Sequence, residues 1–202
     1  MAKLYFTYAA MNAGKSTILL QAAYNYRERG MHALLYTSAL YAGDAGAEIS
    51  SRIGISSPAE LFDAQTDLFA EVSYAHEARA IDSLFVDEAQ FLTREQVWQL
   101  ARVADRLGIP VLCYGLRTDF RGELFEGSAE LLAIADSLRE ARTICHCGRK
   151  ASMVARLDKT GAAITKGEQV SIGKERYVSL CRAHWEERMG RWPMAADDAA
   201  NA

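Results

Sequence analysis

The sequence lacks features that mark several classes of protein. No apolar run approaches the roughly 20 residues that span a membrane, and the apolar start soon meets polar Asn12, Lys15 and Ser16, unlike a signal peptide. The formal charge is −3, whereas proteins that wrap nucleic acids usually carry a net positive charge. We therefore expect a cytoplasmic protein with no membrane partner and no nucleic-acid partner.

Cysteine is scarce, and its placement is uneven. Of four cysteines, Cys145 and Cys147 are almost adjacent, Cys181 follows much later, and Cys113 lies inside an apolar stretch. In a reducing cytoplasm this spacing indicates a metal site rather than a disulfide framework. Cys113 is expected to be an ordinary buried thiol.

The composition is that of a globular protein with a substantial core. The 202 residues are 50% hydrophobic and 24% charged, which suits one domain or one domain with a small appendage. The sequence contains neither an internal repeat nor a long low-complexity linker.

The first three-quarters of the chain alternates β-rich runs with helical runs. Strands are expected near 4–8, 32–37, 83–87, 110–115 and 142–145, and helices over 15–29, 93–108 and 128–141. The second helix opens at Thr93 with Gln96 three residues on, close to a capping box. The segment 42–58, rich in Gly, Ser and Ala, is expected to be a loop. The alternation predicts a parallel sheet covered by helices on both faces.

A phosphate-binding motif stands between the first strand and the first helix. Its residues are Ala9, Ala10, Met11, Asn12, Ala13, Gly14, Lys15 and Ser16, a P-loop in which Ala9 replaces the usual first glycine. Backbone N–H groups at a helix N-terminus are unsatisfied, so they bind phosphate oxygens. Lys15 is expected to bridge the β- and γ-phosphates of ATP, and the Ser16 hydroxyl to bind Mg²⁺. A Gly-Lys-Ser turn also occurs by chance, but the flanking strand and helix favour nucleotide binding.

A pair of acids ends the strand near 83–87. Asp87 and Glu88 close an apolar run, at the carboxyl end of a parallel strand, where such folds bind ligands. Asp87 is expected to hold Mg²⁺, and Glu88, on the other side of the strand, to act as a base. Two alternatives stay open here. The acids are solvated turn residues, or Asp-Glu-Ala-Gln is the box of a nucleic-acid motor ATPase, for which this chain is short and acidic.

Four motifs follow one another along the chain: Met11 within the P-loop, Val86-Asp87-Glu88-Ala89-Gln90-Phe91, Tyr114-Gly115-Leu116-Arg117-Thr118-Asp119-Phe120, and the late cysteine pairs. The same motifs occur in the same order in cytosolic thymidine kinases, and the chain resembles the bacterial members from Lys3 to about Met189. The resemblance implies transfer of the γ-phosphoryl group of ATP to the 5′-hydroxyl of thymidine, giving thymidine monophosphate in nucleotide salvage. It also implies a homotetramer that is inhibited by thymidine triphosphate.

The same resemblance implies roles for individual residues. Glu88 corresponds to the catalytic base. The implied nucleotide and cofactor contacts are the P-loop residues with Asp87, Glu88, Ala89, Gln90 and Arg52. The implied thymidine contacts are Met11, Phe91, Leu116, Phe120, Phe125, Val170, Ser171, Ile172, Gly173 and Tyr177. Apart from the resemblance, Phe120 and Phe125 flank a polar stretch, which suggests exposed rings that contact a ligand or an interface.

The late cysteines form a Cys-x-Cys pair followed by Cys-x-x-His. The four residues are Cys145, Cys147, Cys181 and His184. Three thiolates and one imidazole suit tetrahedral Zn²⁺ with no open position, and therefore a structural site. The thymidine kinases place zinc ligands at these positions. His146, between two of the ligands, is expected to face solvent.

Together these motifs predict an α/β fold, a P-loop (RecA-like) parallel sheet flanked by helices, with a small zinc-binding lobe. The expected domains are a P-loop ATP-binding domain over 1–142, a zinc-binding lobe with a substrate-covering loop over 143–192, and a disordered tail over 193–202. Thymidine kinase is the first hypothesis. The alternatives are a P-loop ATPase acting on nucleic acid and a zinc-containing nucleotide-binding regulator, which needs no base such as Glu88.

Overall fold

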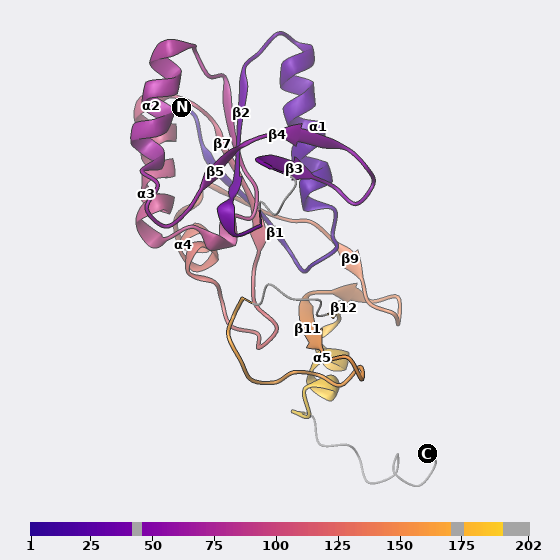
Figure 1. The fold of residues 1–202 in the computed structure, drawn as a ribbon. Helices are drawn as coiled ribbons and strands as arrows, with labels where there is room; N and C mark the ends of the chain where they lie inside the picture. The colour runs from indigo at the N-terminus through magenta and orange to yellow at the C-terminus, as the bar shows by residue number, and fades with distance from the viewer. Residues whose placement is uncertain (42–45, 171–175, 192–202) are drawn as a thin grey trace, which may run out of the picture. The chain divides into compact units, whose positions relative to one another are not determined.

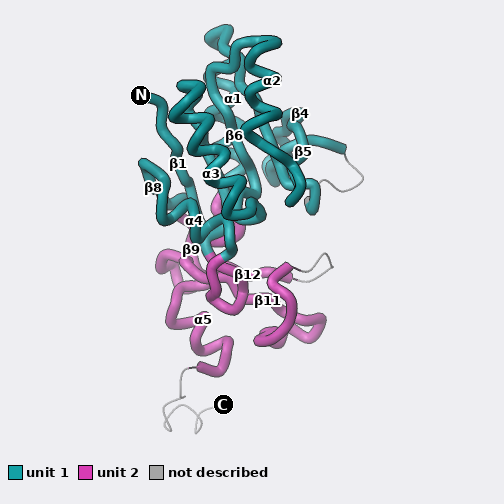
Figure 2. Tube along the Cα trace, turned by 90° about the vertical axis from the view of Figure 1, so that its left-hand side faces the viewer, with its two compact units in different colours: residues 1–9, 14–117, 125–141 teal, residues 10–13, 118–124, 142–202 magenta. Residues whose placement is uncertain are grey.

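The computed structural model describes residues 1–41, 46–170 and 176–191, and Figure 1 shows how their helices and strands follow one another. The chain forms two compact units. Residues 1–9, 14–117 and 125–141 make the first, and 10–13, 118–124 and 142–202 make the second (Figure 2). The predicted tail over 193–202 lies outside the described residues.

The first unit is built on a six-stranded parallel sheet. Its strands lie in the order β5 (Glu60–Phe62), β2 (Ala33–Ser38), β6 (Ser83–Val86), β7 (Val111–Leu116), β1 (Leu4–Ala9) and β8 (Ser137–Glu140). Every pair of neighbours runs parallel. Central strands such as β6 are buried on both faces, which is why they appear in the sequence as continuous apolar runs.

Helices cover both faces of this sheet. They are α1 (Lys15–Glu28), α2 (Leu68–Ala78), α3 (Arg94–Arg102) and α4 (Glu126–Ile134). Side chains alternate along β6, so Phe85 packs in one buried cluster with α1, whereas Leu84 and Val86 pack in another with α2, α3 and α4. Figure 1 shows α1 on one side of the sheet and α2 and α3 on the other. The predicted fold class is confirmed.

Local signals set the helix ends. The capping box predicted at Thr93 is confirmed, because Gln96 N donates to Thr93 Oγ1 at 3.2 Å and Thr93 N donates to Gln96 Oε1 at 3.0 Å. The helix predicted over 93–108 is α3 followed by a π-helical turn, Val103–Leu107. Helix α2 has no counterpart among the predicted helices, although Asp67 caps its start by accepting a hydrogen bond from Ala70 N at 3.0 Å.

The helix predicted over 128–141 is wrong in its second half. Helix α4 ends at Ile134, and the next residues form β8, which pairs with β1. Asp136 supports this change of direction, because its Oδ2 accepts a hydrogen bond from Leu4 N at 2.8 Å. Residues 135–141 do not continue the helix because the edge of β1 offers backbone hydrogen-bond partners that a helix cannot use.

Several short elements complete the first unit. The segment predicted as a loop contains an antiparallel hairpin, β3 (Glu48–Ser50) with β4 (Ser56–Pro58). Short 3-10 turns, Ala39–Tyr41 and Ala89–Phe91, follow β2 and β6. The loop prediction over 42–58 is therefore wrong for these two strands.

The second unit combines short antiparallel strand pairs with one helix. Strand β9 (Thr143–Ile144) pairs with β10 (Lys150–Ala151), β11 (Met153–Leu157) pairs with β12 (Arg176–Leu180), and α5 (Arg182–Arg188) follows. Its buried cluster is small and includes Cys145, Cys181 and Trp185. The indole Nε1 of Trp185 donates to Phe120 O at 3.1 Å and to Val154 O at 3.0 Å. Trp185 thus ties together segments that are far apart in the sequence.

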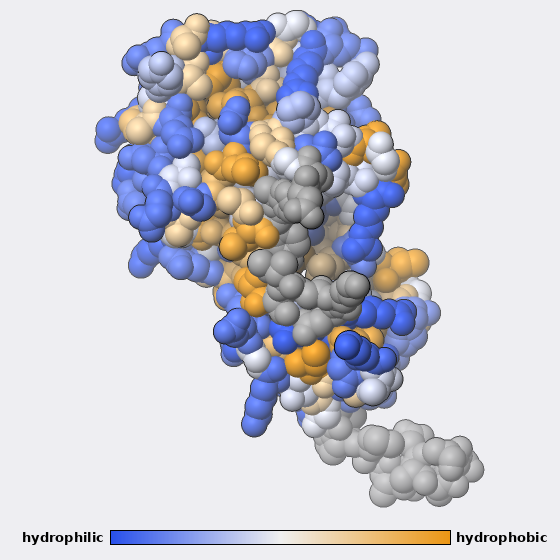
Figure 3. Space-filling model, in the orientation of Figure 1, coloured by the Kyte–Doolittle hydropathy of each residue, from blue (hydrophilic) through white to orange (hydrophobic). Residues whose placement is uncertain are grey.

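The surface is mixed in character. In the face shown in Figure 3, hydrophilic side chains cover much of the helical region around α2 and α3, and apolar surface occurs as separate patches. Scattered apolar exposure of this kind is ordinary for a globular protein. No helix among the described residues combines the length and the apolar character that crossing a bilayer requires.

Candidate active site

The phosphate-binding motif joins β1 to α1. Ala9 ends β1, and Gly14 precedes α1 in the left-handed region, with φ 74° and ψ 22°. Asn12 also has a positive φ of 61°. Left-handed residues alternating with right-handed ones turn successive backbone N–H groups to one side and form a concave anion-binding nest. Glycine suits position 14 because it lacks the Cβ that disfavours this conformation.

Polar side chains of the first unit meet where α1 begins and β6 ends. Ser16 hydrogen-bonds to Asp87, and Lys15 interacts electrostatically with Glu88 and Asp87. Burial lowers the pKa of Lys15, and the two carboxylates oppose that shift. Burial, and then the charge of Glu88, raises the pKa of Asp87 from 3.8 to about 6. This cluster pairs a cation with two acids in unequal surroundings.

Glu88 stands just beyond the strand in an unusual backbone conformation. Its φ of 52° and ψ of 35° lie in the left-handed region, which non-glycine residues rarely occupy. Because β6 ends at Val86, the alternation of a strand does not set the direction of this side chain. Instead, Glu88 Oε2 accepts a hydrogen bond from Gln90 Nε2 at 2.5 Å. Backbone strain of about 1–3 kcal/mol at such a position is typical of functional sites.

Gln90 orients the Glu88 carboxylate. Its side chain is buried, and its Oε1 accepts a hydrogen bond from Leu116 N at 2.9 Å, which leaves the amide nitrogen to face Glu88. Gly115 makes room for this arrangement, since a Cβ there would lie 2.9 Å from both the backbone N and the Oε1 of Gln90. Gln90 is predicted above only as a nucleotide contact, and its orienting role emerges from these contacts.

The predicted substrate contacts are divided between the two units. Phe91, Leu116 and Phe125 belong to the first unit, Met11, Phe120, Val170 and Tyr177 belong to the second, and Ser171, Ile172 and Gly173 lie outside the described residues. The structure brings Phe91 and Phe125 together edge to face, with ring centroids 5.8 Å apart. Arg52 lies exposed in the turn between β3 and β4, and its phosphate contact stays a prediction.

The expectation that Phe120 and Phe125 are exposed is wrong. Their exposed fractions are 1% and 5%. Phe125 packs against Phe91, and the Arg156 guanidinium lies over the Phe120 ring at 4.5 Å from its centroid. The polar sequence around these rings suggests exposure because Arg156 and Phe91, which pack on them, are distant in the chain.

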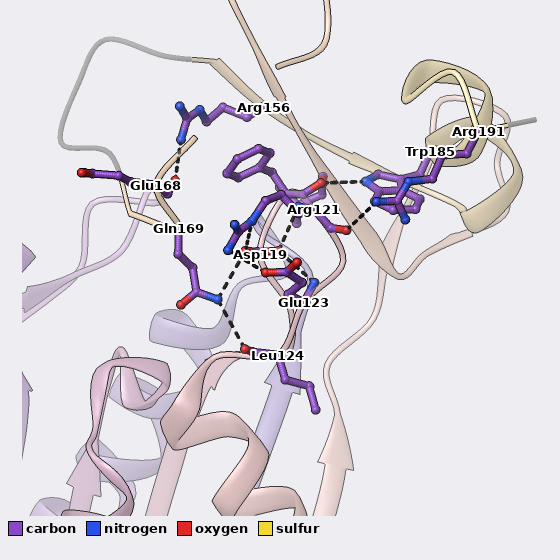
Figure 4. Close-up of polar contacts among 11 residues, drawn as sticks. Asp119, Arg121, Glu123, Leu124, Arg156, Glu168, Gln169, Trp185 and Arg191 are labelled. Carbon is purple, nitrogen blue, oxygen red and sulfur yellow. Dashed lines mark hydrogen bonds and ion pairs between the residues drawn. The ribbon is translucent and has the colours of Figure 1, made fainter. Parts of the chain in front are cut away.

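A buried carboxylate organises the loop that carries Phe120 (Figure 4). Asp119 Oδ1 accepts hydrogen bonds from Arg121 N at 2.8 Å and Glu123 N at 2.9 Å. Its Oδ2 pairs with Arg121 Nε at 3.0 Å and accepts from Gln169 Nε2 at 3.3 Å. These contacts fix the backbone beside Phe120. Those to Arg121 and Glu123 are local, of the kind an aspartate makes in a turn, whereas Gln169 is 50 residues away and no sequence pattern marks it.

The predicted metal ligands converge in the second unit. The ligand atoms of Cys145, Cys147, Cys181 and His184 all lie within 4.8 Å of one another. His184 Nδ1 is 3.3 Å from Cys145 Sγ and 3.4 Å from Cys181 Sγ, and the sulfurs of Cys147 and Cys181 are 3.9 Å apart. Ligands of a tetrahedral zinc ion at about 2.0–2.3 Å are roughly 3.5–3.8 Å apart, so the donor set fits Zn²⁺.

Neighbouring groups support this cluster. Burial, the largest influence, raises the pKa of the Cys145 thiol, but the backbone amides of Cys147 and Cys181, with His184 and Cys147, lower it overall to about 6. The exposed His146 ring stacks on His184 with centroids 4.3 Å apart. Glu187 Oε2 lies 4.0 Å from His184 Nε2, on the ring side away from the cluster, which is too long for a hydrogen bond.

Comparison with known proteins agrees with these features. A family model described as thymidine kinase matches residues 2–185. The chain belongs to the thymidine kinase family. A thymidine kinase of Mesorhizobium japonicum is 64% identical over 199 residues, covering 98% of this chain and 97% of the relative. A thymidine kinase of Escherichia coli strain K12 is 60% identical over 190 residues, covering 94% of this chain and 93% of the relative.

Membership of the thymidine kinase family establishes the class of reaction. The enzyme is a kinase that phosphorylates thymidine, and ATP as co-substrate is implied by the family. The prediction from the four motifs that the chain is a thymidine kinase is confirmed. The alternatives of a nucleic-acid ATPase and of a non-catalytic regulator are set aside.

The close approach at Gly115 gives a first test of the site. Replacing Gly115 with alanine is expected to displace Gln90 and release Glu88, which lowers kcat for thymidine phosphorylation by about 10- to 100-fold, as small misplacements do. The extra methyl group also costs about 1–3 kcal/mol of the free energy of unfolding. Steady-state kinetics and urea unfolding measure the two effects. A kcat within twofold of the native value contradicts the orienting role of Gln90.

Proposed function

We propose that Lys15, Asp87 and Glu88 carry out the transfer of the γ-phosphoryl group of ATP to the 5′-hydroxyl of thymidine. The observation that carries this proposal is the cluster at the end of β6, where Asp87 is hydrogen-bonded to Ser16, Glu88 is held by Gln90, and both acids interact electrostatically with Lys15. Asp87 is buried and hydrogen-bonded to Ser16, whereas Glu88 is half-buried and held by Gln90. Acids in such different surroundings are suited to different roles.

In this proposal Glu88 is the catalytic base. It accepts the proton of the 5′-hydroxyl as that oxygen attacks the γ-phosphorus, and the bond from the γ-phosphorus to the β,γ-bridging oxygen breaks. The products are thymidine monophosphate and ADP. Gln90 engages one oxygen of the Glu88 carboxylate and so directs the other toward the hydroxyl. Lys15 and the loop amides neutralise charge on the phosphates, which phosphoryl transfer mainly requires.

Asp87, the other acid of the cluster, is suited to bind a divalent cation. Asp87 and Ser16 place a carboxylate and a hydroxyl in hydrogen-bond contact, and Mg²⁺ prefers such hard oxygen ligands. We assign these two residues to Mg²⁺, which supplies charge neutralisation at the β- and γ-phosphates when bound. The cluster of three cysteines and His184 is assigned to structural Zn²⁺.

The raised pKa of Asp87 predicts how its removal changes stability with pH. The pKa of Asp87 in the folded protein, about 6, lies above its ordinary value of 3.8. Its contribution to the free energy of unfolding is therefore greatest below pH 3.8 and is lost as the pH rises through 6. Replacing Asp87 with asparagine is therefore expected to raise the free energy of unfolding at pH 8, without nucleotide or Mg²⁺, by up to about 3 kcal/mol.

Urea unfolding at several pH values tests this expectation. The difference in the free energy of unfolding between the Asp87→Asn variant and the native protein should shrink toward zero as pH falls from 8 to 4. Over this range native Asp87 becomes protonated in the folded state. The same variant should lose Mg²⁺-dependent activity. Equal stability of the two proteins at pH 8 contradicts the burial of an ionised Asp87.

Within each unit, the predicted thymidine contacts are proposed to present apolar and aromatic surfaces to the base. In the first unit, the contact between Phe91 and Phe125 supports this role. In the second unit, the ordered backbone around Phe120 supports it. Flat apolar side chains with a few polar groups suit a pyrimidine ring. The described residues Met11, Leu116, Val170 and Tyr177 complete the proposed set.

Three further properties follow the family resemblance. We propose a homotetramer, feedback inhibition by thymidine triphosphate, and a cytoplasmic location. Their support is the similarity to thymidine kinases over nearly the whole chain. Sedimentation analysis and inhibition kinetics test the first two directly.

Thymidine-dependent formation of ADP tests the reaction. With ATP and Mg²⁺, thymidine is expected to stimulate ADP formation and to yield equal amounts of thymidine monophosphate. Single-stranded DNA serves as the control and is expected to have no effect. ATP hydrolysis that responds to DNA and ignores thymidine would overturn the proposed reaction.

A further inference from the structure

Two hydroxyl groups of the second unit hold carbonyl groups of the phosphate loop. Ser179 Oγ on β12 donates to Met11 O at 2.6 Å, and Thr143 Oγ1 on β9 donates to Asn12 O at 3.4 Å. Residues 10–13 accordingly belong to the second unit, not to the unit of the flanking β1 and α1. The middle of the loop is therefore supported by groups other than the strand and helix it joins.

A held carbonyl fixes the direction of the amide that follows it. The peptide unit is planar, and the bonds here are trans, so the carbonyl of Met11 and the N–H of Asn12 point in opposite directions. With Met11 O bound to Ser179, the Asn12 N–H is turned away from β12. Asn12 O and the N–H of Ala13 are related in the same way. Amides of this part of the loop are the donors that phosphate-binding loops present to phosphates.

The two hydroxyls stand at equivalent places relative to the metal ligands. Ser179 is two residues before Cys181, and Thr143 is two residues before Cys145. Cys145 and Cys181 belong to the four-ligand cluster, and β9 and β12 contact each other. Two residues of chain allow little independent movement, so a closed cluster also fixes the spacing of the two hydroxyls.

We propose that Ser179 is a positioning residue for ATP, with Thr143 as its weaker partner. The Ser179 hydroxyl holds the phosphate loop through the Met11 carbonyl, so that the following amides are directed before the nucleotide binds. Preset donors bind charge without the cost of reorganising them. The inference rests on the proposed function, because it assigns this loop to the phosphates of ATP.

Removing the hydroxyl tests the proposal. The Ser179→Ala variant is expected to bind ATP about three- to tenfold more weakly, the usual effect of one lost hydrogen bond, as measured by displacement of a fluorescent ATP analogue. Inorganic tripolyphosphate, which has phosphates and no base, should lose affinity by the same factor. Ser179→Thr restores a hydroxyl and should bind ATP within twofold of the native enzyme.

The chain offers a matched control in helix α2, away from the phosphate loop. Ser73 Oγ donates to Phe69 O in α2, also at 2.6 Å. Ser73→Ala removes a hydrogen bond of the same type and length and should leave the Kd for ATP unchanged. Zinc content and the urea midpoint are measured for every variant. Thr143→Val serves as a second variant, with an expected loss smaller than that of Ser179→Ala.

The possible outcomes distinguish the role of Ser179 from the assignment of the loop to the phosphates of ATP. An unchanged ATP affinity in Ser179→Ala, or a loss seen with ATP and not with tripolyphosphate, overturns the role of Ser179. So does a Ser179→Thr variant that keeps its zinc and binds ATP as weakly as the alanine variant. If the native enzyme phosphorylates thymidine but tripolyphosphate does not compete with ATP, the assignment of the loop to phosphates fails instead.

Discussion

Replacing Glu88 with glutamine is expected to lower kcat by about 10²–10⁴-fold, the usual contribution of a positioned general base. Glutamine has nearly the same shape and can still accept the hydrogen bond that Gln90 Nε2 donates at 2.5 Å, so the site keeps its geometry and loses only the basic group. Affinity for ATP is expected to change little. ADP formation with saturating thymidine measures kcat, and displacement of a fluorescent ATP analogue measures affinity.

Glu126 provides the control for this substitution. It is an exposed glutamate whose Oε1 accepts a hydrogen bond from Arg94 N at 2.8 Å, outside the proposed chemistry. Glu126→Gln should keep a native kcat. A Glu88→Gln enzyme with kcat within about tenfold of native would mean that deprotonation of the hydroxyl does not depend on this carboxylate.

Removing zinc is expected to unfold the second unit. Its buried cluster is small and includes two of the ligands, Cys145 and Cys181, so an empty site leaves thiols in place of the metal bonds. Structural zinc sites contribute on the order of 10 kcal/mol of apparent binding energy, which is folding energy where no preformed site exists. Hydrogen exchange should show loss of protection in β11 and β12 after treatment with a zinc chelator, while β6 and β7 stay protected.

Cysteine variants distinguish metal loss from general damage. Cys181→Ser should reproduce the exchange pattern of the chelated enzyme and lower the zinc content, because one of the four ligands is removed. Cys113 is buried in β7 and is not part of the ligand cluster, so Cys113→Ala should keep its zinc. A metal-free enzyme that keeps full protection in β12 contradicts the structural role of the site.

The predictable part of the fold rests on local patterns. Strands such as β6 are covered on both faces, so each shows a short apolar run, and the alternation of these runs with helices predicts a parallel sheet. The capping box at Thr93 is equally local. The strand Ser137–Glu140 could not be predicted from local pattern, because its helical preference is overridden by pairing with β1.

The candidate site also has a part that local sequence predicts and a part that it does not. The P-loop, the acids at the end of β6 and the two pairs of metal ligands are recognisable because each motif or pair keeps its chemistry within a few residues. The burial of Phe120 was not predictable, because Arg156, whose guanidinium lies over the ring, is far along the chain. The same holds for Asp119 and Gln169, whose contact joins residues 50 positions apart.

The sequence by itself determined the class of fold, the position of the phosphate loop and the identity of the acids and metal ligands. Only the tertiary structure decided how these groups are held. Gln90 meets Leu116 across 26 residues, and Ser179 meets Met11 across 168 residues. A hydrogen bond needs its two atoms within about 3 Å, and spacing along the chain sets that separation only for near neighbours. For distant residues the packing of the sheet, helices and strand pairs sets it.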